Sequence, residues 1–183
     1  GSVIYGSDAI GGVMAFQSLT PKFSGFDKQL SVNVNATLRH STANAEKTGH
    51  FDLNVGSKKF AYVTSVSYND FGELRMGSDG PEESLKKLEE IREGGKDVIV
   101  VNKDSLVQVP SGYSQLNLMQ KFRFGVSENW DVQYAFHYSE TSEYSRYDRH
   151  IRYRNGFPRY GEWKYGPQKW LMNQLTLTHN STG

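Results

Sequence analysis

Strict alternation of apolar and polar residues is the feature that most constrains the fold of this 183-residue sequence. Across residues 30–38 every even position is apolar and every odd position is Ser, Asn or Thr. Successive side chains of a β-strand point to opposite faces, so this pattern predicts a strand with one apolar and one polar face. Similar alternation recurs near residues 50–55, 60–68, 115–124, 130–138 and 169–179. The sequence therefore predicts an all-β fold with about six strands.

The connections between these predicted strands fall into two classes. Short polar turns occupy residues 56–59 and 126–129, whereas long segments occupy residues 69–112 and 140–168. Short turns on one side of a sheet and long loops on the other are typical of outer-membrane β-barrels.

The first long loop is predicted to contain one short helix. Pro81 suits a first helical position, and acidic residues directly after it suit the positive end of the helix dipole. Leu85, Leu88 and Ile91 form a narrow apolar stripe at helical spacing, and Gly94-Gly95 is expected to end the helix. We expect the stripe to pack this extracellular helix onto its own loop or onto a barrel rim.

The length and the ends of the predicted strands suit a membrane wall. A strand crosses the hydrocarbon core of a bilayer in roughly 9–11 residues, and residues 115–124 and 130–138 form segments of about that length. Aromatic residues stand at or near strand ends, as they do at membrane interfaces. These aromatic residues are Phe60, Tyr68, Phe124, Trp130 and Tyr138.

The opposite faces carry charged residues that suit a water-filled interior better than a sealed core. They are Arg39, Asp52, Lys121, Arg123, Asp131 and His137. A sheet can cross a bilayer only as a closed barrel, because lipid cannot satisfy backbone amides. We therefore predict a partial transmembrane antiparallel β-barrel, an open sheet in this chain, whose apolar face contacts outer-membrane lipid. The alternative is a soluble or surface β-sheet binding module, such as a lectin-like domain, with one wet face.

Composition argues against several other classes of function. The formal net charge is +1, which disfavours a nucleic-acid partner, and the absence of Cys removes disulfides and the commonest zinc sites. Apolar runs are only a few residues long, so no transmembrane helix is expected. The sequence lacks a Gly-x-Ser-x-Gly elbow and a His-Glu-x-x-His pair. We therefore expect no enzymatic activity, no metal and no cofactor.

The first residues carry a more specific motif. Val3-Ile4-Tyr5-Gly6-Ser7-Asp8-Ala9-Ile10-Gly11-Gly12-Val13 resembles the end of the plug domain of TonB-dependent outer-membrane transporters. The matching positions are Tyr5, Gly6, Ser7, Ala9, Gly11 and Gly12. In that family the motif directly precedes the first barrel strand, and here polar residues 20–25 lead into the best alternating strand. The resemblance implies the C-terminal end of a plug domain in residues 1–22 and the N-terminal part of a β-barrel domain in residues 23–183.

The resemblance also implies a biological role. Transporters of this family take up a scarce nutrient, such as an iron–siderophore complex or haem, across the cell outer membrane of Gram-negative bacteria. The TonB energy-coupling complex would act through an N-terminal part that is missing here. The chain begins Gly1-Ser2 without Met and finishes in a turn-like sequence, so we expect both ends to be cuts through a longer protein, although cloning also leaves a Gly-Ser start.

The second long loop holds the candidate ligand contacts. Its aromatic and basic side chains could stack on a flat ligand and pair with its carboxylates. The candidates are Tyr144, Arg146, Tyr147, Arg149, His150, Arg152, Tyr153, Arg154, Tyr160 and Trp163. Residues 144–149 and 160–169 also resemble the haem, haemoglobin and transferrin receptors of the same family, and His150 could coordinate a haem iron. The alternative is a loop held together by Arg–Asp pairs and Tyr stacking, with a solvated His150.

Overall fold

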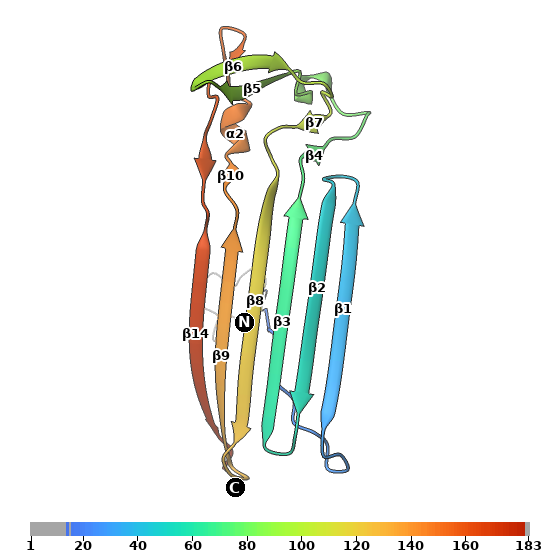
Figure 1. Cartoon of the computed structure of the whole chain (residues 1–183), viewed down its shortest axis with the longest axis vertical. Coiled ribbons are helices and arrows are strands. Elements are labelled where there is room, and N and C mark those ends of the chain that lie inside the picture. Colours follow the sequence, from blue (N-terminus) through green and yellow to red (C-terminus); the bar gives the residue numbers. More distant parts are fainter. Residues whose placement is uncertain (1–13, 15, 182–183) are drawn as a thin grey trace.

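The computed structural model describes residue 14 and residues 16–181 (Figure 1). The motif that resembles a plug, Tyr5, Gly6, Ser7, Ala9, Gly11 and Gly12, lies outside the described residues. The main body is one sheet of six long strands, and two long loops form a separate layer at one end of it (Figure 1).

All six long strands pair antiparallel, in the order β1-β2-β3-β8-β9-β14. Their bounds are β1 (Ser31–Ser41), β2 (Glu46–Gly56), β3 (Phe60–Phe71), β8 (Tyr113–Gly125), β9 (Trp130–Thr141) and β14 (Lys169–His179). Within the described chain, β1 and β14 form the two edges, so the sheet is open. The predicted all-β fold with an open antiparallel sheet is confirmed.

The strands are longer than the sequence pattern alone indicated. Each has 11 to 13 residues, and β2 begins at Glu46, four residues before the first alternating position. The extension follows from pairing, because Ser41 lies opposite Glu46 and completes the β1–β2 ladder. Strand β14 has the bounds that the alternation predicted.

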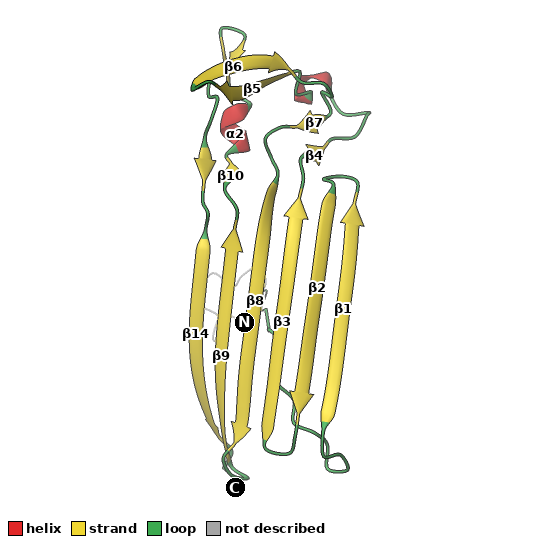
Figure 2. Cartoon of the chain, in the orientation of Figure 1, coloured by secondary structure: helices red, strands yellow, loops and turns green. Residues whose placement is uncertain are grey.

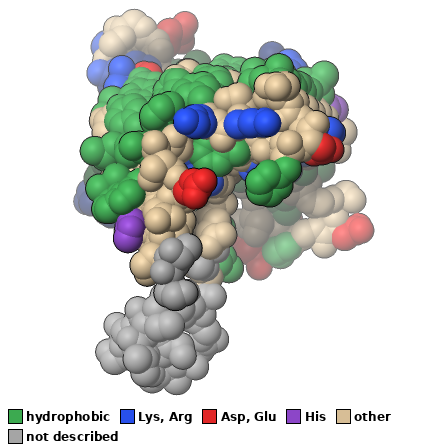
Figure 3. All heavy atoms as spheres, turned by 90° about the horizontal axis from the view of Figure 1, so that it is seen from below, with side chains coloured by type: hydrophobic (Ala, Val, Ile, Leu, Met, Phe, Trp, Pro, Cys, Tyr) green, Lys and Arg blue, Asp and Glu red, His purple; other side chains and the backbone are tan. Residues whose placement is uncertain are grey.

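The register places apolar side chains in rows that cross the whole sheet. One such row is Val32, Val55, Tyr62, Phe122, Tyr134 and Leu175. Within this row the rings of Tyr62 and Phe122 lie 4.8 Å apart. Figure 3 looks along the strands from the short-turn end and shows hydrophobic side chains gathered along one side of the molecule. The alternation therefore becomes one continuous apolar face.

This apolar face is not covered by other described residues. Val34 is 55% exposed and Leu175 is 72% exposed, and Leu30 and Val32 are also more than half exposed. The few fully buried apolar side chains lie on the opposite, polar face. They are Ala61, Val63 and Ala135. The sheet thus has almost no interior of its own on its apolar side.

The chain before β1 lies across the polar face. Lys121 Nζ donates to Ser18 Oγ at 2.8 Å, and Asn54 Nδ2 donates to the Thr20 carbonyl at 3.1 Å. Pro21 is fully buried there. A Cβ added to Gly56 would meet the Lys22 carbonyl oxygen at 2.0 Å, so this close approach requires glycine.

Both long loops leave the same end of the sheet (Figure 2). The first holds β4 (Leu74–Arg75) paired with β7 (Val107–Gln108), η1 (Glu82–Ser84), and a hairpin of β5 (Leu88–Glu93) and β6 (Lys96–Val101). The second holds β10 (Tyr144–Ser145) paired with β13 (Lys164–Tyr165), α2 (Tyr147–His150), and β11 (Tyr153–Arg154) paired with β12 (Phe157–Pro158). We call these two loops together the cap.

The turns at the two ends differ as predicted, with one addition. Residues 57–59 and 126–129 form short turns at the end away from the cap. At the cap end, residues 42–45 form a short turn between β1 and β2, so that end is not made of long loops alone.

The predicted helix that begins at Pro81 is wrong. Only Glu82–Ser84 forms a single 3-10 turn, and Leu88–Glu93 is a strand that pairs with Lys96–Val101. Gly94 and Gly95 do not end a helix but form the hairpin turn, with φ of 56° and 81°. Positive φ at both central residues is the mark of a type I′ turn, which suits the twist of a hairpin. Among the described residues, no helix is long and apolar enough to cross a membrane.

Candidate functional site

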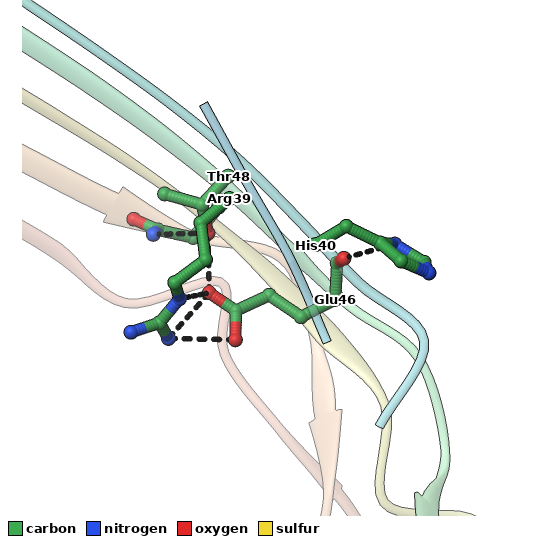
Figure 4. Close-up of polar contacts among 5 residues, drawn as sticks. Arg39, His40, Glu46 and Thr48 are labelled. Carbon is green, nitrogen blue, oxygen red and sulfur yellow. Dashed lines mark hydrogen bonds and ion pairs between the residues drawn. The ribbon is translucent and has the colours of Figure 1, made fainter. Parts of the chain in front are cut away.

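The polar face is a hydrogen-bonded network that contains several ion pairs. Near the cap, Arg39 donates to both carboxylate oxygens of Glu46, at 2.8 and 2.6 Å, and Thr48 Oγ1 donates to the same carboxylate at 2.6 Å (Figure 4). Glu46 is only 2% exposed. A buried carboxylate is tolerated when it is paired and hydrogen-bonded in this way.

Similar pairing continues along the rest of this face. Asn35 donates to Asp52, whose other oxygen lies 3.2 Å from His50 Nε2. Close to the short turns, Arg123 donates to both oxygens of Asp131 at 3.0 and 2.9 Å, and its guanidinium lies 4.8 Å from the centre of the Phe23 ring. The polar face therefore positions the chain before β1, and its buried Lys121 donates to the Ser18 hydroxyl of that chain rather than to a carboxylate.

Two of the basic candidates of the second loop, Arg146 and Arg149, are paired with Asp148 within the cap. Arg146 Nε donates to Asp148 at 2.8 Å, and Arg149 lies 3.6 Å from the other oxygen of Asp148 and 5.2 Å from the centre of the Trp163 ring. Because Arg146 binds it, Asp148 has a lowered pKa. The Tyr160 and Trp163 rings meet edge to face at 4.9 Å. These are the Arg–Asp pairs and ring contacts of a loop that holds itself together.

His150 does not lie at the surface, so it is not the solvated side chain that one alternative predicted. It is 3% exposed, and its carbonyl accepts a hydrogen bond from the buried Lys86 Nζ at 2.7 Å. Burial lowers the pKa of His150, and the neighbouring Lys86 adds to that effect, whereas the carbonyls of Trp163 and Tyr160 oppose it. In this arrangement the backbone carbonyl of His150 links the second loop to Lys86 of the first loop.

The remaining candidates divide between two places. Arg152, Tyr153 and Arg154 are exposed on and beside the β11–β12 hairpin. Tyr147 is partly buried, and its hydroxyl donates to Gln108 of the first loop. Tyr144 lies at the base of the cap, where the polar face of the sheet ends. The structure therefore does not bring all ten candidates into one site.

Tyr144 belongs to a row of four aromatic rings that sequence reasoning did not identify. Phe71 and Tyr113 lie 5.0 Å apart, Tyr113 and Tyr144 6.3 Å apart, and Tyr144 and Tyr165 6.3 Å apart, measured between ring centres. We call these four residues the aromatic row. Tyr113 stands at a polar-face position of β8 and Ser114 interrupts the alternation, so the pattern gave no signal for this member of the row. The other contacts join residues far apart in the chain.

An open pocket of about 480 Å³ lies beside the two central rings of this row. Ser111, Tyr113, Gln115, Thr141, Tyr144, Ser145 and Gln168 line it. In the part of the chain that the structure describes, no group of three or more His, Asp or Glu side chains is placed to hold a metal ion. The pocket is therefore the best-placed candidate site for a small ligand near the cap.

Comparison with known proteins adds no assignment. No family model, curated protein or solved structure matches this chain.

Proposed function

We propose that this chain is part of an outer-membrane transporter of the TonB-dependent kind, which takes up a scarce nutrient such as an iron complex or haem. The observation that carries the proposal is the exposed apolar face that backs onto a hydrogen-bonded polar face. In the four described rows from Phe60–Leu177 up to Ala36–Leu171, the apolar face carries no Asp, Glu, Lys, Arg or His. Lipid would cover such a face, and water would wet the other.

Three further features support the proposal. Strands of 11 to 13 residues are long enough to span a bilayer, which takes roughly 9–11. Charged residues return to the apolar face at its cap end, with Lys47 near Asp70 and Lys169 beside Glu140, where headgroups would lie. The chain before β1 lies against the polar face, as the end of a plug would lie inside a barrel.

The second candidate is a lectin-like β-sheet binding module. It is favoured by a row of uncharged polar residues at mid-height of the apolar face, Thr64, Gln120 and Asn173. The side-chain oxygen of Asn173 accepts a hydrogen bond from the Tyr134 hydroxyl at 2.6 Å, so this oxygen has a partner without water. In a lectin-like module another layer of protein, rather than lipid, would cover this face.

Membrane insertion separates the two candidates. The complete polypeptide is refolded from urea in plain buffer, in detergent micelles and in phosphatidylcholine vesicles, and folding is followed by the shift of the unboiled band in gel electrophoresis. We expect a folded, protease-resistant form only with micelles or vesicles. A monomeric, fully folded protein in plain buffer contradicts the transporter proposal and supports the binding module.

Transport itself needs a second measurement. In cells that carry the complete protein, we expect uptake of the nutrient to stop when the proton gradient is collapsed, while surface binding continues. Binding and uptake that both persist without the gradient would contradict the energy-coupled mechanism.

A further inference from the structure

The aromatic row crosses four neighbouring chain segments at the mouth of the polar face. Phe71 ends β3, Tyr113 begins β8, Tyr144 lies in β10 directly after β9, and Tyr165 lies in β13 shortly before β14. The row therefore runs across the strands rather than along one of them. Neighbouring ring centres lie 5.0, 6.3 and 6.3 Å apart, so the row presents a similar apolar surface at each ring. A ligand made of repeating units matches such a surface better than a compact one.

The lining of the adjacent pocket consists of uncharged groups only. Besides two tyrosines it presents the hydroxyls of Ser111, Thr141 and Ser145 and the amides of Gln115 and Gln168. Hydroxyls and amides both donate and accept, so they match ligand groups that do the same. Aromatic faces with a few such polar groups are the usual composition of a site for a neutral small molecule.

Several of these groups are free to bind. Among the described residues, the side chains of Tyr113, Tyr144, Ser145 and Gln168 make no hydrogen bond to another side chain or to the backbone. Ser111 is different, because it donates to the Glu73 carboxylate at 2.9 Å and accepts from the Leu74 amide. The free groups lie beside the two central rings, where a ligand stacked on the row would meet them.

The charges nearest the row are already paired. Arg146 lies 5.9 Å from the centre of the Tyr165 ring, but its guanidinium binds Asp148. The Glu73 carboxylate accepts hydrogen bonds from Ser111 and from the Gly112 amide. A haem or an anionic iron chelate brings carboxylates or other negative groups, and these would find no unpaired cation in this pocket.

From this geometry we infer that the aromatic row and its pocket bind a neutral polyhydroxylated chain, an oligosaccharide, at the mouth of the polar face. The sugar rings lie on Tyr113, Tyr144 and Tyr165, and their hydroxyls exchange hydrogen bonds with Ser145, Thr141 and Gln168. This inference rests on the proposed function, since it names the substrate class of a transporter whose mouth this row would line.

Binding is tested with the complete protein in detergent micelles. The probes are a set of neutral glucans, xylans, mannans and galactans of six sugar units, titrated by calorimetry, with hexagalacturonate and haemin as charged comparisons. We expect at least one neutral oligosaccharide to bind and both charged probes to bind more weakly. Tyr144→Ala and Tyr165→Ala should each weaken that binding by roughly tenfold, as the loss of a stacked ring does in other sites.

Phe157→Ala is the control, because it removes an exposed ring of the cap outside the row. We expect it to leave oligosaccharide binding unchanged. Tyr144→Phe keeps the ring and loses only the hydroxyl, so it should bind better than Tyr144→Ala and guards against misfolding of the alanine variant.

The inference is overturned if no neutral oligosaccharide binds at millimolar concentration, or if binding is insensitive to both row substitutions. It is also overturned if haemin or hexagalacturonate binds more tightly than every neutral probe. The vesicle experiment reports separately on the proposed function. Insertion without saccharide binding refutes only the ligand class, whereas saccharide binding by a protein that folds in plain buffer refutes only the transporter.

Discussion

Val34 and Asn33 are neighbours in β1, but their side chains lie on opposite faces of the sheet. Val34 stands opposite Leu53 on the exposed apolar face, whereas Asn33 stands opposite Asn54 on the face that the chain before β1 crosses. Tyr134 and Gln133 form the same kind of pair in β9. At the scale of single residues, the proposed transporter requires that one of two adjacent side chains face lipid and the other face water.

Arginine substitutions on the two faces test this assignment. We expect Val34→Arg and Tyr134→Arg to destabilise the folded protein in vesicles by about 2–4 kcal/mol, the cost of an outward charge near the bilayer midplane. Asn33→Arg and Gln133→Arg place the same charge on the wet face and should cost much less. Urea unfolding in vesicles measures the difference. Equal losses on both faces would contradict the assignment of the apolar face to lipid.

Lys86 joins the two loops of the cap by a side-chain hydrogen bond, as Tyr147 also does. Lys86 is 4% exposed and its ammonium donates to the His150 carbonyl, and burial lowers its pKa while Glu90 and Glu89 oppose that shift. Lys87, the next residue, is exposed and pairs with Glu82. The two lysines therefore form a matched pair of buried and exposed positions.

We expect Lys86→Met to loosen both loops, because it leaves the buried His150 carbonyl without its donor at a cost of about 1–3 kcal/mol. Hydrogen exchange followed by mass spectrometry should show faster exchange in residues from both loops at once. Lys87→Met serves as the control and should change exchange very little. Loosening of the first loop alone would indicate that the contact with His150 does not hold the loops together.

At the scale of elements, the β5–β6 hairpin depends on its two glycines. A Cβ added at either glycine meets nothing within 4 Å, so any penalty of substitution comes from the positive φ alone. Positive φ costs roughly 1–2 kcal/mol for an ordinary L residue, whereas Asn followed by Gly is favoured in a type I′ turn. Substitutions at these two glycines therefore measure backbone strain without a steric clash.

We expect Gly95→Val to destabilise the hairpin by about 1 kcal/mol or more and Gly94→Asn to be nearly neutral. The protection of the β5 and β6 amides against hydrogen exchange measures both effects. If Gly94→Asn disrupts the hairpin as much as Gly95→Val does, the turn is not of type I′.

At the scale of the whole molecule, the cap is a second folded layer built from two segments far apart in sequence. Its stability should depend on pH through His150. The pKa of His150 is lowered in the closed cap. On acidification the imidazole therefore binds a proton in the opened cap at a higher pH than it does in the closed cap. The contribution of His150 to the stability of the closed cap is therefore complete above about pH 6.5, and it is lost as pH falls through the lowered pKa.

Other charged groups near His150 act on the same equilibrium. Lys86 and Asp148 face it with opposite charges. Burial raises the pKa of Glu90, so its protonation favours the closed cap as pH falls, in the opposite direction to His150. We expect His150→Gln, which stays neutral and keeps the carbonyl, to remove most of the opening between pH 7.5 and 5. Hydrogen exchange of the cap in the two proteins at each pH tests this, and identical pH responses would count against His150.

The sequence by itself determined the six long strands, their two faces and the short turns near residues 56–59 and 126–129. Side-chain alternation is a property of each strand alone, so residues 30–38 and 130–138 predict their faces without knowledge of their neighbours. The role proposed for the sheet, and the residues 1–22 that resemble a plug, also come from the sequence and remain predictions.

Only the tertiary structure decided what the loops do. The stretch from Glu82 to Ile91 fits a helix locally, but Leu88–Glu93 gains backbone hydrogen bonds and apolar contacts from Lys96–Val101, and that pairing outweighs helical propensity. His150 is buried because Lys86, 64 residues earlier, reaches its carbonyl. The aromatic row joins residues from four segments of the chain. Contacts between such distant residues leave no periodic pattern in the sequence, so only the folded chain reveals them.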